Sequence, residues 1–262
     1  MTSIRHPNVA GMFYPADAQT LEQAVHAYLT AAKKDHSPAP KAIVAPHAGY
    51  VYSGPVAGSA YAQLLERGDE VSRVILLGPS HRMSFHGLAY SRADAFLTPL
   101  GSVPVEQQAY DRLADLPQVR AFEAPFEGEH CLEVQLPFLQ LTLGQFKIVP
   151  FLVGDTTSNE VAEVIELLWG GDETLIVISS DLSHYLDYDS ARRIDAATSR
   201  AIEALQPEDI THHQACGRNP LIGLLREAQR HGLHARTLDL RNSGDTAGPR
   251  DRVVGYGAYA FT

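Results

Sequence analysis

Three apolar runs in this chain each lead, through a short turn, to a histidine. The segments are residues 42–47, 74–81 and 175–184, which end in His47, His81 and His184. Unbroken runs of β-branched residues and leucine are typical of parallel strands that are buried on both faces. In open α/β sheets, ligands bind beyond the carboxyl ends of the strands. Imidazole is a common ligand of transition metals and a ready general base, so we expect a histidine-rich metal centre at these strand ends.

The turns that carry His47 and His81 resemble each other. Pro46 directly precedes the first histidine, and Pro79 lies two residues before the second. Proline ends a strand because it cannot donate a hydrogen bond to the ladder. Two such turns in consecutive strand–helix units favour two metal ligands at neighbouring strand ends. The alternative is that each imidazole only bonds a backbone carbonyl within a tight turn.

Asp181 lies three residues before His184, in the turn that follows the third apolar run. A carboxylate close to an imidazole fixes its tautomer and raises its basicity. This spacing predicts that His184 is an acid/base residue and that Asp181 orients it or ligates the metal. The alternative is that Asp181 caps a helix and His184 is solvated.

His130 and Glu133 lie in a segment, residues 129–141, that we expect to be helical despite Pro137. Residues three apart share a face of a helix, so both side chains are candidates for the site. Carboxylates near a helix N-terminus are also common as surface groups that interact with the helix dipole. That explanation suits Glu127 and Glu129 and suits His130 less well, because the neighbours of His130 are apolar.

Asp245 belongs to a late segment, Asn242–Thr246, that has the composition of a turn. It is a candidate for the carboxylate of a two-histidine, one-carboxylate triad, which suits non-haem Fe(II). The alternative is a surface hairpin loop. A different chemistry would use Ser53 or Ser80 as a nucleophile with a histidine base, but the chain contains no G-x-S-x-G motif.

Composition excludes several functional classes. The 262 residues carry a formal net charge of -10, which argues against a nucleic-acid-binding surface. No run approaches the roughly 18 apolar residues of a membrane span, and residues 1–14 lack the apolar core of a signal peptide. The two cysteines, Cys131 and Cys216, form neither a disulfide framework nor a C-x-x-C zinc pattern. We therefore expect a cytoplasmic protein that binds neither nucleic acid nor membranes.

The periodicity of apolar residues predicts alternating strands and helices. The predicted strands are 42–47, 73–77, 146–153, 174–178 and 253–261, and the predicted helices are 17–34, 55–67, 105–116, 129–141, 158–168, 188–205 and 220–231. The final strand has no polar face, so we expect it to be buried on both sides. Such alternation indicates a mainly parallel or mixed sheet with helices on both faces. No polar or Gly/Ser-rich gap divides the chain, so residues 1–262 are predicted to form one α/β domain.

Taken in order along the chain, the motifs resemble the Memo family, whose microbial members include the AmmeMemoRadiSam system protein B. The matching motifs lie at residues 10–15, 45–50, 53–54, 77–81, 129–137, 179–185 and 242–245. The resemblance covers nearly the whole chain. It implies a fold similar to that of class III extradiol (LigB-type) dioxygenases. Those enzymes hold Fe(II) with two histidines and one glutamate and cleave catechol-type rings with O2.

Site residues follow from this resemblance by position. It implies that His47 and His81 are metal ligands, that His184 beside Asp181 is the acid/base residue, and that His130 lines the same pocket. We also expect Tyr50, Ser80 and Glu133 to contact the substrate.

The third ligand is the point at which the resemblance weakens. Animal Memo proteins are expected to place a cysteine in the late loop, at the position of Thr246. With Asp245 adjacent, we expect its hard carboxylate to complete the site instead. The predicted cofactor is then a divalent metal, with Fe(II) first and Zn, Mn or Cu as alternatives.

Three functions are open at this stage. The first is a dioxygenase-like, O2-dependent oxidoreductase. The second is a non-catalytic module that binds a peptide or protein on the same scaffold, since fold similarity does not carry function. The third is a metal-assisted hydrolase with His184 or Glu133 as the base. The resemblance also implies an AMMECR1-domain protein and a radical SAM enzyme as partners.

Overall fold

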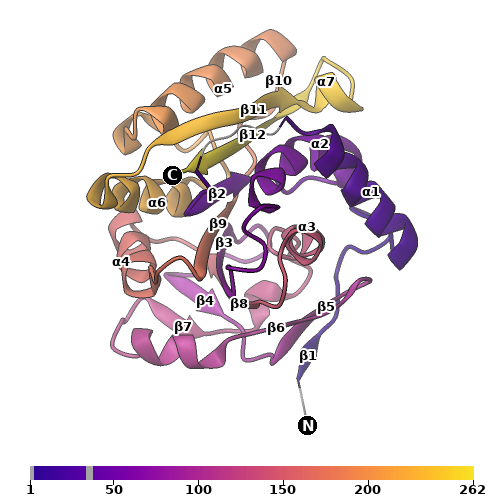
Figure 1. The fold of residues 1–262 in the computed structure, drawn as a ribbon. Coiled ribbons are helices and arrows are strands. Elements are labelled where there is room, and N and C mark those ends of the chain that lie inside the picture. Colours follow the sequence, from indigo (N-terminus) through magenta and orange to yellow (C-terminus); the bar gives the residue numbers. More distant parts are fainter. Residues whose placement is uncertain (1–2, 34–37) are drawn as a thin grey trace.

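Strands from both ends of the sequence share the main sheet of the protein. The computed structural model describes residues 3–33 and 38–262 (Figure 1). Within these residues the main sheet runs in the order β10-β12-β2-β9-β3-β8-β4-β7, and β11 pairs with β12. Its strands are β2 (Ala42–Ala45), β3 (Arg73–Pro79), β4 (Leu88–Tyr90), β7 (Val119–Ala121), β8 (Lys147–Val153), β9 (Thr174–Ser179), β10 (His184–Leu186), β11 (Ala235–Asn242) and β12 (Val253–Phe261).

The centre of this sheet is parallel and fully buried. Strand β9 lies between β2 and β3, with Val44 opposite Ile178 and Ile75 opposite Ile176, and β8 continues the parallel set beside β3. All residues of β2 and β9 are buried, which explains their unbroken apolar runs. The prediction of buried parallel neighbours is confirmed. The carboxyl ends of β2, β3 and β9 therefore meet at one edge.

Antiparallel strands flank this parallel centre. Strand β12 runs antiparallel to β2, β11 and β10, and β4 runs antiparallel to β8. The sheet is thus mixed, with a parallel core, as expected. Strand β12 is buried along almost its whole length, so its lack of a polar face reflects cover from both sides. A separate sheet of three strands contains β1 (Ile4–Arg5), β5 (Ala95–Thr98) and β6 (Gly101–Pro104).

Helices cover both faces of the main sheet (Figure 1). Helices α1, α2 and α3 gather on one side, and α4 and α6 pack together on the other, while α5 packs against β11 and β12. The helices are α1 (Ala18–Ala31), α2 (Tyr50–Tyr61), α3 (Leu136–Thr142), α4 (Ser158–Leu168), α5 (Tyr188–Glu203), α6 (Arg218–His231) and α7 (Ser243–Thr246). These layers confirm the predicted α/β class.

The helix boundaries reflect local capping. The Asp17 side chain accepts a hydrogen bond from the backbone N–H of Thr20 and so caps α1. This helix ends at Ala31, and Lys34, the predicted end, lies outside the described residues. Thr157 and Glu160 form a reciprocal capping box at the start of α4.

Three predicted helices are partly wrong. Helix α2 begins at Tyr50 rather than near Ser53, because its first turn is already anchored: the Tyr50 N–H donates to the carbonyl of Phe13. Residues 105–116 form only a 3-10 helix, Gln107–Leu113. Residues 129–141 are not one helix either. A loop and a 3-10 turn precede α3, which starts at Leu136 and places Pro137 in its first turn, where proline is tolerated.

Candidate metal centre

His47 presents one ring nitrogen to the edge of the sheet in a fixed tautomer. The carbonyl of Cys131 can only accept, so the Ser179 hydroxyl donates to it at 2.6 Å. The same Oγ atom accepts from the Gln135 side-chain amide at 2.8 Å. His47 Nδ1, 2.8 Å from this oxygen, is therefore the donor of their hydrogen bond. The lone pair of His47 lies on Nε2, as a metal ligand requires.

Burial keeps His47 neutral. The side chain is 2% exposed, and burial lowers its pKa well below the usual value, with the nearby His81 and His130 adding to the effect. A neutral imidazole is the form that coordinates a metal ion.

His81, in the loop after β3, is oriented by Glu129. The Glu129 carboxylate accepts the backbone N–H of His81 at 2.6 Å and lies 3.0 Å from its Nδ1. It also accepts the N–H groups of His130 and Cys131. Burial opposes ionisation of Glu129, but these hydrogen bonds and His81 outweigh it and hold its pKa at about 2. An ionised carboxylate on Nδ1 directs Nε2 of His81 into the site.

His130 is the third imidazole of the cluster. Its ring lies 5.1 Å from that of His81 and 5.7 Å from that of His47, measured between centroids. One ring nitrogen from each of the three histidines lies within 4.8 Å of the others. Nδ1 of His130 is buried and has no hydrogen-bond partner among the described residues. Burial lowers its pKa, which favours the neutral imidazole that can coordinate a metal ion.

Cys216 adds a thiol that sequence reasoning missed. Its Sγ lies 3.2 Å from Nε2 of His47 and accepts the backbone N–H of Asp181 at 3.2 Å. Burial and the Asp181 carboxylate raise the pKa of this thiol, so a bound cation would be needed to stabilise the thiolate. No periodic signal in the sequence marks Cys216, which immediately precedes Gly217 and helix α6, because the packing of α6 on β3 and β9 exists only in the folded chain.

Asp181 contacts both His47 and Cys216. Its Oδ1 accepts the backbone N–H of His47 at 2.8 Å, and its Oδ2 lies 3.9 Å from Nε2 of the same histidine. The carboxyl is buried, and burial raises its pKa. Asp181 therefore fixes the His47 loop and places a carboxylate oxygen beside the cluster. It does not cap a helix.

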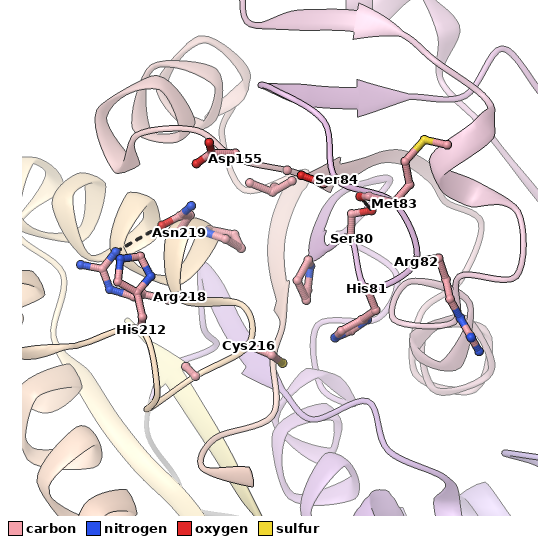
Figure 2. Close-up of a pocket in the computed structure, with 15 residues that line it drawn as sticks. Ser80, His81, Arg82, Met83, Ser84, Asp155, His212, Cys216, Arg218 and Asn219 are labelled. Carbon is pink, nitrogen blue, oxygen red and sulfur yellow. Dashed lines mark hydrogen bonds between the residues drawn. The ribbon is translucent and has the colours of Figure 1, made fainter.

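Two cavities meet at His81 and Cys216. The smaller, of about 380 Å³, is polar and includes Arg218 and Asn219. Figure 2 shows His81 and Cys216 on facing sides of this cavity, with Arg82 pointing away. The larger, of about 780 Å³, has a mainly apolar lining. His81, His212, Ala215 and Cys216 line both cavities. A metal held by the cluster would be reached from either side.

A family model described as Memo-like protein matches residues 5–260. The chain belongs to the Memo family. It is similar to a MEMO1 family protein of Archaeoglobus fulgidus, with 37% identity over 98% of this chain and 99% of the relative. MEMO1 family proteins of Aquifex aeolicus, at 34% over 97% of both chains, and of Aeropyrum pernix, at 36% over 97% and 98%, are also similar. The resemblance inferred from the motifs is confirmed.

His184 of this Memo-family chain lies apart from the three-histidine cluster. It begins β10 rather than ending β9, and it lines the larger cavity with Leu182, Leu186 and Ile194. The carbonyl of Leu182, 2.8 Å from Nδ1, can only accept, so Nδ1 is the donor. Nε2 of His184 is then the basic nitrogen of its ring. Asp181 bonds the His47 loop instead of orienting this imidazole.

Asp245 is not brought to the cluster. It lies in α7, where one carboxylate oxygen accepts from the Tyr188 hydroxyl at 2.6 Å and the other from the Asn242 backbone N–H at 3.1 Å. Among the described residues it joins no group of potential metal ligands. The segment predicted as a metal-binding turn or a hairpin loop is instead a short helix, capped by Asn242. The expectation of Asp245 as the third ligand has no geometric support.

The three residues predicted to contact the substrate, Tyr50, Glu133 and Ser80, do not lie together. Tyr50 is buried and donates its hydroxyl to the carbonyl of Val134. Glu133 is also buried, and its carboxylate accepts from the Tyr14 hydroxyl and from backbone N–H groups of the N-terminal arm. Ser80 lines the smaller cavity and donates to the carbonyl of Met83. Since residues 129–141 are not one helix, His130 and Glu133 do not share a helical face.

None of the helices in the described part of the chain has the length and apolar character needed to cross a membrane.

Proposed function

We propose that this Memo-family chain is a metal-dependent oxidoreductase that uses O2 to oxidise a small organic substrate. His47 and His81 would hold the metal, with Cys216 as the third ligand. The observation that supports this proposal is the convergence of the imidazoles of His47, His81 and His130, with the Cys216 thiol beside His47. The contact between His47 Nε2 and Cys216 Sγ, at 3.2 Å, is the centre of that arrangement.

The donor set indicates which metals suit the site. Imidazole suits Fe, Cu and Zn, and a thiolate adds preference for softer ions such as Cu(I). The hard carboxylate of Asp245, which would favour Fe(II), Mn or Zn, lies elsewhere. We therefore propose Fe(II) or Cu(I) as the bound ion, with Zn as the alternative that has no redox chemistry. When bound, such an ion would supply electron transfer to O2 and polarise a coordinated substrate oxygen.

The residues around the metal would bind the substrate and move its protons. The larger cavity offers apolar contacts from Leu182, Leu186 and Ile194 for a hydrocarbon or aromatic ring. His184 in the same cavity donates from Nδ1 to the carbonyl of Leu182, so its Nε2 is the atom that would accept a proton from a substrate hydroxyl. The ring of His130 stacks on that of His81 and supports its orientation.

Anaerobic metal reconstitution tests this proposal. Wild type should take up about one Fe(II) or Cu(I) per chain, whereas His47→Ala and His81→Ala should lose the ion while their circular dichroism stays native. Asp245→Asn is the matched control and should keep the metal, because within the described part of the chain Asp245 bonds Tyr188 and Asn242 and not the cluster. Equal metal content in wild type and both histidine variants would contradict the site.

The O2-dependent step needs a second measurement. Nitric oxide binds ferrous sites that have an open coordination position, so the Fe(II)-loaded protein should give the EPR signal of a ferrous nitrosyl complex. Uptake of Zn with exclusion of both Fe(II) and Cu(I) would contradict the oxidative function and favour metal-assisted hydrolysis.

A further inference from the structure

A second group of potential metal ligands joins helices α4 and α6, at the opposite end of α6 from Cys216. Glu227 and His231 lie four residues apart on α6 and so share a face of that helix. Glu166 of α4 faces them. One ligand atom from each of Glu166, Glu227 and His231 lies within 4.8 Å of the others.

Glu227 is the residue that points to a missing ligand. It is 0% exposed, and its Oε1 accepts from Arg230 at 2.8 Å. Its Oε2 is buried, receives no N–H or hydroxyl hydrogen bond from the described residues and lies 3.9 Å from Nε2 of His231. Its carboxyl group faces that of Glu166, and burial together with this contact raises the pKa of Glu227 to about 7. Buried carboxylate oxygens are costly unless they are bonded or coordinate a cation.

The other two proposed ligands, Glu166 and His231, lie close to this oxygen and to each other. Nε2 of His231 lies 2.7 Å from Oε2 of Glu166. Two ligands of a tetrahedral ion, each about 2.1 Å from the metal, are about 3.4 Å apart. The separations of 2.7 and 3.9 Å bracket this value, so sub-ångström side-chain shifts would create a three-ligand site. Trp169 holds the imidazole in place by stacking on it, with centroids 3.9 Å apart and an interplanar angle of 7°.

We propose that Glu166, Glu227 and His231 form a second metal site, for a small divalent cation of the zinc class, which cross-links α4 to α6. Two carboxylates and one imidazole are a ligand set that Zn²⁺ takes readily. Among the described residues, the arginine that contacts this group is Arg230, and it bonds Oε1 of Glu227. The rival explanation is a proton shared between the two carboxylates, with no metal bound.

The single tryptophan of the chain makes this site directly observable. Trp169 is the only tryptophan in the sequence, and it contacts the proposed ligand His231. A paramagnetic ion such as Co²⁺ bound at His231 should therefore quench the fluorescence of Trp169. Zn²⁺, which has a filled d shell, should displace Co²⁺ and restore the emission. We expect the quenching to saturate with about one Co²⁺ bound at this site, in addition to any Co²⁺ bound at the His47 cluster.

Three variants separate this site from other metal-binding groups. Glu166→Gln keeps the exposed α4 surface and the Trp169–His231 stack, and it should weaken Co²⁺ quenching at least about tenfold. Glu163→Gln, one helical turn earlier on α4 and bonded to Gln118, should leave quenching unchanged. His47→Ala should also leave it unchanged, since that histidine belongs to the other cluster.

Glu227→Gln removes the buried oxygen and should abolish the saturable quenching. If that variant unfolds, Glu166→Gln still decides the question. Quenching that rises linearly with Co²⁺, or that is the same in Glu166→Gln and wild type, would overturn the proposal and leave the shared proton as the explanation of the cluster.

Discussion

The Sγ atom of Cys216 lies 3.2 Å from Nε2 of His47, although 169 positions separate the two residues in the sequence. His47 follows β2, and Cys216 directly precedes α6. The parallel order of β2 and β9 brings the loop after β9 beside His47, and Asp181 in that loop donates its N–H to Cys216. The fold therefore builds an imidazole–thiol pair from segments with no local sequence relationship.

Cobalt spectroscopy should detect this thiol as a ligand. We expect Co²⁺-loaded wild type to show a sulfur-to-cobalt charge-transfer band in the near ultraviolet, since a thiolate transfers charge to the ion and an imidazole does not. Cys216→Ser should lose this band and bind Co²⁺ more weakly.

The other cysteine provides the control for that experiment. Cys131 is buried and donates its S–H to the carbonyl of Pro79, although its Sγ lies within 4.8 Å of ligand atoms of His81 and Glu129. Cys131→Ser should keep the charge-transfer band. If the band survived in Cys216→Ser and disappeared in Cys131→Ser, the sulfur ligand would be Cys131, and our assignment of Cys216 would be wrong.

Glu129 should control metal affinity without being a ligand in our proposal. It fixes His81 through both the backbone N–H and Nδ1, and loss of such supporting partners typically costs 10–100-fold in metal affinity. Glu129→Gln should therefore raise the Kd for the metal by roughly 10–100-fold. Competition with a chromophoric chelator measures this change. An unchanged Kd in a natively folded variant would remove Glu129 from the site.

The strand ends could be predicted from the sequence, because buried parallel strands leave unbroken apolar runs. Those runs correctly placed His47 and His81 at one edge of the sheet. The same reasoning placed His184 at this edge, and there it was wrong. The chain makes a further turn after β9 before His184 begins β10.

The position of Cys216, the third ligand in our proposal, could not be predicted for a different physical reason. Cys216 lies in a loop with no periodic pattern, and only the packing of α6 against β3 and β9 brings it to the edge. Asp245 has the right chemistry and the turn composition of a binding loop, but the capping of α7 and the Tyr188 hydroxyl engage its carboxylate. Local composition records neither relationship.

Asp195 should make stability depend on pH. Its side chain is 2% exposed on α5 and accepts the backbone N–H of Ser183 at 3.0 Å. Burial raises its pKa to about 6, above the value near 3.9 of an unfolded chain. Between these values the folded state binds more protons than the unfolded state, so this residue's contribution to the free energy of unfolding falls as pH rises from about 4 to about 6.

Asp195→Asn removes that titration while keeping an acceptor for the Ser183 N–H. The metal-free variant should gain up to about 2–3 kcal/mol over wild type at pH 7, and should show little of this advantage at pH 4. Urea denaturation at both pH values measures the difference. Asp189→Asn, an exposed position on the same helix, should show no such pH-dependent gain; an equal gain there would point to helix charge rather than burial.

Gly217 should be required for the placement of Cys216. A Cβ atom at this position would lie 2.7 Å from Cβ of Ser180 and 2.8 Å from the carbonyl oxygen of Ser179, closer than side chains normally approach. Its backbone φ of -87° suits alanine, so the obstacle is steric. Because Ser179 also bonds His47, Gly217→Ala should push α6 away from the edge. We expect a loss of about 1–3 kcal/mol in unfolding free energy and a metal Kd raised at least about tenfold.

Gly49 is the matched position on the other side of the site. It lies two residues after His47 with a φ of -55°, and an added Cβ would meet its nearest atom at an ordinary 3.6 Å. Gly49→Ala should therefore change stability by no more than about 0.5 kcal/mol and leave metal affinity unaltered. Urea denaturation of the metal-free proteins and chelator competition distinguish the two glycines. If Gly217→Ala bound metal as tightly as Gly49→Ala, the close packing of α6 on the β9 loop would not be what holds Cys216 beside His47.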